Sequence, residues 1–168
     1  IHTSTSTLQH VQKLLEQGKH VALVSDAGTP GVSDPGLEVV SKARDAGADI
    51  ETIPGASALT AALAIAGLRA ATFTFYGFLP LKKGRETLFK EIAANDRASV
   101  FYESPHRIMK TLEALGKGLS AERRIGVFRE LTKLYEEHRI GSAAEVFSYF
   151  QDNPGKQRGE FVVIVEGL

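Results

Sequence analysis

Hydrophobic and polar residues follow one another along the N-terminal part of the chain in an order that predicts helices alternating with strands. Residues 8–15 place their leucines and valine on one face of a helix, and Gly18 supplies a stop signal. The apolar run within 20–25 is typical of a strand buried on both faces, as in a parallel sheet. A second helix follows Pro35, and a second strand is predicted at 50–53.

The pattern changes after the next predicted helix. That helix, over 57–65, is almost entirely alanine and leucine, so we expect it to be buried. The alternation up to this point implies a parallel sheet with right-handed crossovers. The sequence GFLP at 77–80, followed by KKG, interrupts it. We therefore predict two domains, residues 1–77 and residues 78–168.

The second predicted domain mixes both kinds of strand connection. Its strands and helices mostly alternate, but two strands near 131–133 follow each other without a helix, which favours a mixed sheet. The predicted helices cover 85–94, 107–115 and 143–150. The predicted strands cover 72–76 just before the boundary, then 99–102, 125–129, 135–140 and 160–166.

Composition limits the chemistry. The chain has 20 basic and 20 acidic residues, so any nucleic-acid contact must use a local basic patch. It has no cysteine, which excludes disulfides, thiolate metal sites and a cysteine nucleophile, and we expect a cytoplasmic protein. No apolar run reaches the roughly 20 residues that span a bilayer. Because the chain starts at Ile1 without a methionine, we expect a fragment or a processed chain.

The strongest functional signal is the loop SDAGTPGVSDPG at 25–36, between a predicted strand and a predicted helix. Ligands of open α/β sheets bind at the carboxyl ends of strands, and glycines let the backbone approach them. Asp26 and Thr29 are candidates to hydrogen-bond such a ligand. The loop is neither a dinucleotide fingerprint nor a P-loop. The alternative is a tight turn in which Ser33 or Asp34 caps the helix.

A second loop, PGASA at 54–58, follows the next predicted strand. The two loops would lie side by side and outline one ligand pocket. Ser57 is interpreted as a helix cap, because no nucleophile elbow surrounds it.

The sequence FYESPHR at 101–107 places charged groups at another strand end. Arg107 is a candidate for a phosphate contact, and Glu103 or His106 for handling a hydroxyl proton. The alternative is that Glu103 pairs with Arg107 while Ser104 caps the helix. No second histidine or acid stands at a metal-binding spacing from His106, so we expect no metal site.

Two further segments carry basic side chains. Arg129 and Lys133 belong to RELTK, at the end of the next predicted strand, where they could grip RNA or form surface ion pairs. Lys82, Lys83 and Arg85 form a small basic loop that could meet an RNA backbone or be merely solvated.

Six motifs in this order resemble the ribosomal RNA small subunit methyltransferase I family, of the tetrapyrrole methylase superfamily. They cover essentially the whole chain: SDAGTPxxSDPG, PGxSA, GFLP, FYESPHR, RELTK and GEFVxxVEG. The resemblance implies a tetrapyrrole-methylase-like α/β fold with two domains and a cofactor cleft between them. It also implies that the parallel sheet of the N-terminal domain is incomplete here, because the family's first strand and the loop after it are absent.

The resemblance implies transfer of a methyl group from S-adenosylmethionine to a cytidine ribose 2′-oxygen in the decoding region of 16S rRNA, within the 30S subunit. It further implies a homodimer with no metal and no membrane association. The catalytic candidates are then Glu103, His106, Arg107 and Arg129, and the RNA-binding candidates Lys82, Lys83, Arg85 and Lys133. The motifs assign these residues to the cofactor: Ser25, Asp26, Ala27, Gly28, Thr29, Ser57, Ala58, Phe101 and Tyr102.

Because the family's N-terminal segment is absent, we expect this chain alone to bind the cofactor weakly and to show little activity. Three alternatives stay open: a tetrapyrrole or precorrin methyltransferase, a diphthine-synthase-like protein methyltransferase, and a noncatalytic rRNA-binding module.

Overall fold

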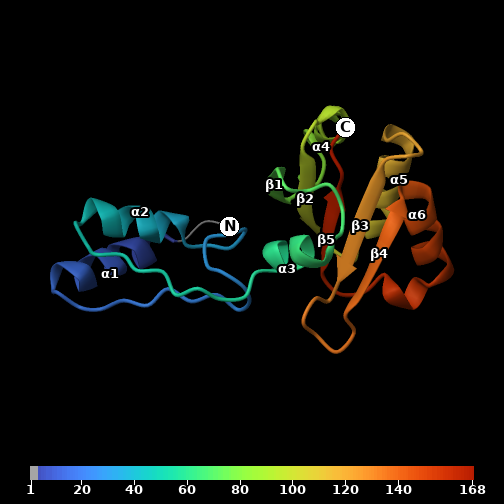
Figure 1. The fold of residues 1–168 in the computed structure, drawn as a ribbon. Helices are drawn as coiled ribbons and strands as arrows, with labels where there is room; N and C mark the ends of the chain where they lie inside the picture. The colour runs from blue at the N-terminus through green and yellow to red at the C-terminus, as the bar shows by residue number, and fades with distance from the viewer. Residues whose placement is uncertain (1–3) are drawn as a thin grey trace. The chain divides into compact units, whose positions relative to one another are not determined.

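The computed structural model describes residues 4–168, which form two compact units (Figure 1). The first unit is Ile1–Ser57 and the second is Ala58–Leu168. This division falls earlier in the chain than the boundary expected after residue 77. The reason is that β1 (Phe73–Phe78) pairs with β2 (Ala98–Glu103), so the segment before the GFLP motif belongs to the sheet of the second unit.

The first unit contains two helices that pack against each other, α1 (Thr5–Glu16) and α2 (Leu37–Asp45). Both helices agree with the sequence pattern. The strands predicted at 20–25 and 50–53 are wrong, because no hydrogen-bonded strand precedes Phe73 in residues 4–168. A strand needs a neighbour that pairs with its backbone groups, and neither segment has one.

The second unit is a five-stranded mixed sheet with helices on both faces. The sheet order is β1-β2-β5-β3-β4, with β1 and β2 parallel and the other neighbours antiparallel, which confirms the predicted mixed sheet. The remaining strands are β3 (Arg124–Arg129), β4 (Glu137–Ser142) and β5 (Phe161–Val165). The helices are α3 (Ala58–Ile65), α4 (Arg85–Ala94), α5 (Ile108–Gly118), α6 (Ala143–Asp152) and the short 3-10 helix η1 (Pro154–Lys156).

Side chains that alternate along the central strands build two separate cores. Phe101 of β2 and Val163 of β5 point to the face covered by α4, α5 and α6. The next residues, Tyr102 and Val162, point to the face covered by α3. Because successive strand residues face opposite sides, a shift of one residue would exchange these two sets.

The carboxyl ends of β1, β2 and β3 meet at one edge of the sheet. This follows from the topology, because β1 runs parallel to β2, and β2 and β3 both run antiparallel to β5. Phe161 of β5 is the register partner of Glu103 on one side and of Arg129 on the other. The two charged residues are thus two strands apart, about 10 Å. The strand ends that carry the candidate charges therefore converge, as the sequence predicts.

The chain after β5 lies against the turn between α4 and β2. The Leu168 amide donates to the Asn95 carbonyl at 3.1 Å, and Arg123 Nε donates to the Glu166 carbonyl at 2.7 Å. Between them, Gly167 passes so close to the backbone of Asp96 that a Cβ would lie 2.1 Å from its carbonyl oxygen. Glycine is required here for close approach, whatever its dihedral angles.

Gly167→Ala should therefore lower the free energy of unfolding by about 1–3 kcal/mol, because a backbone carbonyl cannot yield to the new methyl group. Gly116→Ala is the matched control: it lies within α5 with nothing within 4 Å of its Cβ position. Alanine there should stabilise by up to about 1 kcal/mol through helix propensity. Urea denaturation of both variants measures this, and equal effects would contradict the close approach.

An ion cluster joins β4 to α6 and η1 around the half-buried Glu137. Its carboxylate lies 2.9 Å from Lys156 Nζ and 3.2 Å from the Arg139 guanidinium, and it accepts a hydrogen bond from the Tyr149 hydroxyl. Burial raises the pKa of Glu137, but the hydrogen bonds from Tyr149 and Lys156 and the nearby cations outweigh it, so the net pKa lies below the usual value. The charged carboxylate is therefore part of the folded structure.

The stabilisation by Glu137 should depend on pH. Its pKa is lower in the folded than in the unfolded state, so its contribution is fully present above the unfolded value of about 4.3 and is lost as pH falls through the folded value. The difference in unfolding free energy between wild type and Glu137→Gln should thus be largest near neutral pH and shrink in acid. Glu122→Gln, at an exposed position, is the control. A difference that does not change with pH would contradict this assignment.

Candidate functional site

The two glycine-containing loops of the first unit are tied together. The Thr29 hydroxyl donates to the Ala56 carbonyl at 3.2 Å, across the two loops that the sequence places side by side. Within the first loop, the Val32 amide donates to the Thr29 carbonyl at 3.2 Å, and Gly31 has φ of 82°. Proline at the second position and a positive φ at the third are features of a type II turn. The loop thus holds a fixed shape.

The start of α2 corrects one interpretation of this loop. The N-cap residue is Gly36, which makes no side-chain cap, so neither Ser33 nor Asp34 caps the helix. Gly36 has φ of 135°, and a Cβ there would lie 2.8 Å from the Leu23 side chain. Glycine is needed at position 36 for both packing and conformation. Asp34 has no capping role.

Several predicted cofactor residues gather at the beginning of the same loop. Ser25 and Asp26 border a hollow of about 330 Å³ whose other lining comes from α1, from the segment before Ser25 and from the start of α2. The Ser25 hydroxyl is engaged with the Ala27 and Gly28 carbonyls at 3.3 and 3.4 Å. The Asp26 carboxylate is exposed and has no hydrogen bond or ion pair within residues 4–168.

These groups have the chemistry that S-adenosylmethionine requires. The cofactor carries two cationic centres and ribose hydroxyls, which a free carboxylate such as Asp26 can bind. Gly28 has φ of 74° and no side chain, so its loop can approach a ligand closely. Three other cofactor residues implied by the motifs belong to the two loops. Ala27 lies between Asp26 and Gly28, Ser57 ends the first unit, and Ala58 begins α3.

Glu103 is fully buried in the second unit, and both of its carboxylate oxygens are occupied. Oε1 accepts the Ser104 amide at 2.8 Å and pairs with Arg107 Nε at 2.8 Å. Oε2 accepts Arg85 Nη2 at 2.9 Å and the Thr111 hydroxyl at 2.6 Å. The expected pair with Arg107 is confirmed. A carboxylate with four partners is poorly suited to take up a proton, so the structure corrects the candidate role of Glu103 as a base.

The two arginines of this network hold the GFLP segment. Arg85 Nη1 donates to the Pro80 carbonyl at 3.0 Å, and Arg107 Nη1 donates to the Leu79 carbonyl at 2.9 Å. The two arginine side chains are 15% and 17% exposed, and each is bonded both to Glu103 and to a carbonyl of this segment, which leaves little of either accessible for the predicted phosphate contact. Lys82 and Lys83, which follow this segment, are exposed, and their side chains make no hydrogen bond or ion pair within residues 4–168.

His106 is the remaining catalytic candidate of the FYESPHR motif. Its side chain is exposed just before α5 and has no hydrogen bond or ion pair in the described part of the chain. Among residues 4–168 there is also no group of three or more histidine, aspartate or glutamate side chains that could hold a metal ion. His106 is therefore free to contact a substrate.

The RELTK motif builds the loop between β3 and β4. Arg129 Nε donates to the Arg158 carbonyl at 2.6 Å and its Nη1 to the Tyr135 carbonyl at 3.1 Å. Lys133 Nζ bridges Glu130 at 3.1 Å and Glu160 at 2.8 Å. Arg129 is only 11% exposed, so the structure assigns it to the loop and not to catalysis. Lys133 is 46% exposed and keeps part of its ammonium group accessible.

Phe101 and Tyr102, both predicted to contact the cofactor, point to opposite faces of the sheet. Phe101 is fully buried beneath the helices, so its side chain is part of the core. Tyr102 packs edge-on against Phe75 and Phe78, with ring centroids 5.0 and 5.5 Å apart. Sequence reasoning missed these two partners. The sequence signal for these partners was the run of aromatic residues in FTFYGF at 73–78, which overlaps the GFLP motif.

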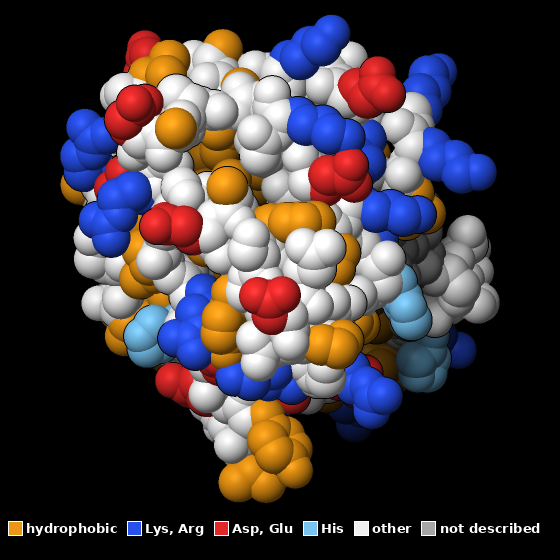
Figure 2. Space-filling view, turned by 90° about the vertical axis from the view of Figure 1, so that its right-hand side faces the viewer, with side chains coloured by type: hydrophobic (Ala, Val, Ile, Leu, Met, Phe, Trp, Pro, Cys, Tyr) orange, Lys and Arg blue, Asp and Glu red, His pale blue; other side chains and the backbone are white. Residues whose placement is uncertain are grey.

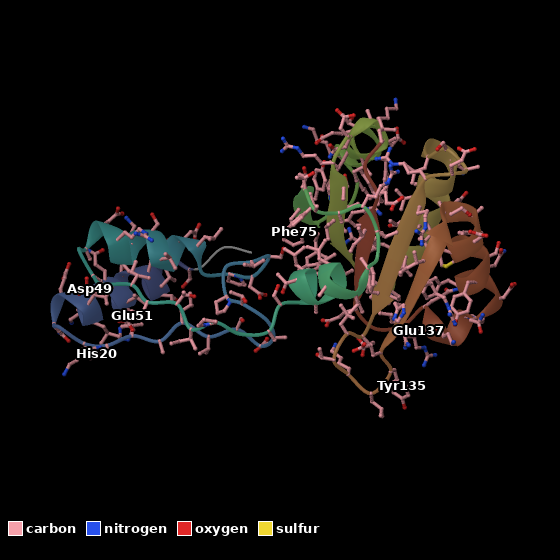
Figure 3. The ribbon with its side chains drawn as sticks, viewed as in Figure 1. His20, Asp49, Glu51, Phe75, Tyr135 and Glu137 are labelled. Carbon is pink, nitrogen blue, oxygen red and sulfur yellow. The ribbon has the colours of Figure 1, made fainter. Side chains whose placement is uncertain are left out.

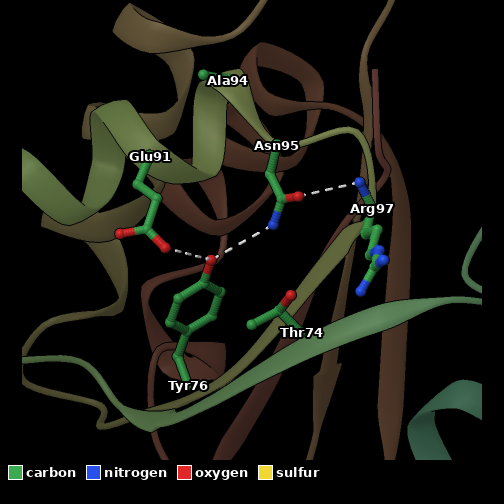
Figure 4. Close-up of a pocket in the computed structure, with 6 residues that line it drawn as sticks. All are labelled: Thr74, Tyr76, Glu91, Ala94, Asn95 and Arg97. Atoms are coloured by element: carbon green, nitrogen blue, oxygen red, sulfur yellow. Dashed lines mark hydrogen bonds between the residues drawn. The ribbon is translucent and has the colours of Figure 1, made fainter.

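A second hollow, of about 400 Å³, lies beside the edge strand β1 (Figure 4). The Tyr76 hydroxyl donates to Glu91 at 3.1 Å and accepts from Asn95 at 3.4 Å. Burial raises the pKa of Tyr76, so the phenol stays protonated. These polar groups are hydrogen-bonded to one another, and their network supports β1. The hollow is a depression of the surface.

Comparison with known proteins shows which family this chain resembles. A family model described as Tetrapyrrole (Corrin/Porphyrin) Methylases matches residues 3–146. A Ribosomal RNA small subunit methyltransferase I from Pasteurella multocida is 43% identical over 91% of this chain and 55% of its own length. The protein of that name from Synechocystis is 41% identical over 99% of this chain and 59% of its own length. The chain thus spans a little over half the length of these two relatives.

Solved structures agree in fold. The methyltransferase CobJ covers 95% of this chain and 70% of its own, with a TM-score of 0.69 and 24% identity. A uroporphyrin-III-C-methyltransferase from Thermus thermophilus covers 98% and 72%, with a TM-score of 0.61 and 20% identity. No helix in residues 4–168 is long and apolar enough to cross a membrane. The extended match to the family model and to these relatives shows that the chain belongs to the tetrapyrrole methylase family and, within it, to the ribosomal RNA small subunit methyltransferase I family.

Proposed function

We propose that this chain is the part of a methyltransferase that binds S-adenosylmethionine and presents ribosomal RNA for methylation. The observation that supports this best is the free carboxylate of Asp26 on a loop whose shape is fixed by the bond from Thr29 to Ala56. A rigid loop with an unpaired carboxylate is preorganised for a cationic ligand. S-adenosylmethionine, when bound, supplies the methyl group.

The proposed acceptor is the 2′-hydroxyl of a cytidine in 16S rRNA within the 30S subunit. The six sequence motifs support this target, and the names of the relatives support small-subunit rRNA in general. The relatives are longer than this chain, so we propose the complete reaction for proteins of the relatives' length. We further propose a cytoplasmic and homodimeric enzyme, and the proposed rRNA substrate supports the cytoplasmic location.

The engaged and free side chains suggest a division of labour. His106 is the group proposed to accept the hydroxyl proton, because it alone among the four catalytic candidates has no partner within residues 4–168. Glu103, through Arg85 and Arg107, is proposed as a positioning residue that holds the GFLP segment. Lys82 and Lys83, just beyond that segment, are proposed to contact phosphates. Positioning of this kind can account for a large part of the rate of a methyl transfer.

Calorimetric titration with S-adenosylmethionine tests the cofactor proposal. Wild type should bind, although weakly, and Asp26→Asn should weaken binding at least about tenfold, because a hydrogen bond to a charged group contributes roughly 1.5–3 kcal/mol. Asp49→Asn, another exposed aspartate of the first unit, should bind like wild type. Absence of binding by wild type would reject the proposed function.

Transfer of a labelled methyl group from S-adenosylmethionine to 30S subunits tests the role of His106. His106→Ala should lower the rate about 10²- to 10⁴-fold, the usual contribution of a general base, without changing the free energy of unfolding. Glu103→Gln should instead lower that free energy by about 3–5 kcal/mol, because it leaves two buried arginines without a counter-charge. Resistance of the labelled nucleotide to alkali identifies 2′-O-methylation. A fully active His106→Ala would remove this residue from catalysis.

A further inference from the structure

We infer that the tip of the β3–β4 hairpin and the cations beside it form a binding surface for single-stranded RNA. This hairpin surface consists of Lys133, Leu134, Tyr135, Arg139 and Lys156. The inference rests on the proposed function, which supplies the RNA. It adds a contact site on the second unit, separate from the loop that carries Lys82 and Lys83.

The tip exposes two large side chains with nothing packed on them. Leu134 is 87% exposed and Tyr135 is 67% exposed. The tip projects from the body of the second unit, and hydrophobic side chains protrude at the lower end of the face in Figure 2, with Lys and Arg side chains above them. Tyr135 and Glu137 are labelled near each other at this end of the unit in Figure 3. A protruding aromatic ring offers its face to a nucleobase.

The tip is held in one conformation although it is exposed. Glu130 and Thr132 have φ of 51° and 65°, a left-handed conformation that non-glycine residues rarely adopt. The Thr132 amide donates to Glu136 Oε2 at 2.6 Å, and Arg129 Nη1 donates to the Tyr135 carbonyl. A loop fixed by these bonds presents Tyr135 with little conformational entropy left to lose on binding.

The ion cluster beside the tip directs its positive charge outward. Glu137 is 15% exposed, whereas its partners Arg139 and Lys156 are 45% and 40% exposed. Lys133 is likewise more exposed, at 46%, than Glu130, at 17%. The carboxylates thus lie inside and the cationic groups outside, as a surface that meets phosphates requires.

Two exposed carboxylates lie among these cations, so the surface depends on which charged groups are exposed and not on an excess of positive charge. Glu160 pairs with Lys133 at 2.8 Å, and Glu136 is occupied by the Thr132 amide. Arg139 lies over the Tyr149 ring, with its guanidinium carbon 3.9 Å from the centroid, which fixes the group in place. Hydrogen bonds to Tyr149 raise the pKa of both Arg139 and Lys156, so both remain charged at neutral pH.

An exposed aromatic ring at the hairpin tip, with fixed cations on the same hairpin and on η1, matches single-stranded RNA better than duplex. Unpaired bases can stack on Tyr135 while the flanking phosphates meet Arg139, Lys156 and Lys133. The whole chain carries no net charge, so such a local surface is the form that an electrostatic contact with RNA must take here.

Fluorescence anisotropy with a short labelled single-stranded oligoribonucleotide, over a series of salt concentrations, tests this surface. Tyr135→Ala should weaken binding about 5- to 100-fold through lost stacking, and leave the salt dependence unchanged. Tyr135→Phe should restore it. Arg139→Gln should reduce the slope of log affinity against log salt by about 0.7, one phosphate contact on a single strand. Lys90→Gln, an exposed lysine on α4, is the control and should bind like wild type.

The same variants should lose affinity for 30S subunits in the same order. Wild-type affinity in both Tyr135→Ala and Arg139→Gln would overturn the inference. If Arg139→Gln proves unstable, Tyr135→Ala alone decides the test, because Tyr135 is 67% exposed and its truncation removes little packing. A Tyr135→Ala protein with a changed oligomeric mass but unchanged RNA affinity would also overturn it, in favour of self-association. Titration with S-adenosylmethionine is measured separately, so loss of the proposed function is distinguishable from loss of this surface.

Discussion

The buried carboxylate of Glu103 is the interaction on which the strand ends of the second unit depend. It ends β2 and binds two arginines, Arg85 at the start of α4 and Arg107 just before α5. Those arginines extend further to the Leu79 and Pro80 carbonyls after β1. One acidic group therefore connects two strands and two helices. Removing its charge leaves both guanidinium groups buried without compensation.

The sequence predicted the second unit well because its patterns are local. The apolar runs at 99–102 and 160–166 predict strands that form, and the adjacent strands on either side of RELTK imply the mixed sheet that forms. The strands at 20–25 and 50–53 were predicted from equally apolar runs, yet they do not form. A parallel strand depends on partners distant in sequence, and residue pattern alone does not reveal whether a partner is present.

The candidate site shows the same limit at the level of single side chains. The sequence predicted the pair between Glu103 and Arg107, but it could not tell an engaged charge from a free one. In the sequence, Arg85, Arg129 and Lys82 are all basic residues near a strand end. In the structure, Arg85 and Arg129 donate to backbone carbonyls, whereas the Lys82 side chain has no partner within residues 4–168. Whether a charge is free depends on the fold around it.

The distinction between engaged and free charges also explains how a chain without net charge can contact RNA. Acids such as Glu103, Glu130 and Glu137 are drawn inward, where they organise arginines and lysines. Each inward carboxylate lies farther from an approaching phosphate than the exposed cation that it binds, so the cation acts on that phosphate at shorter range. The balance of 20 acids and 20 bases is thus compatible with cationic surfaces at particular places. Geometry, and not composition, decides where those surfaces lie.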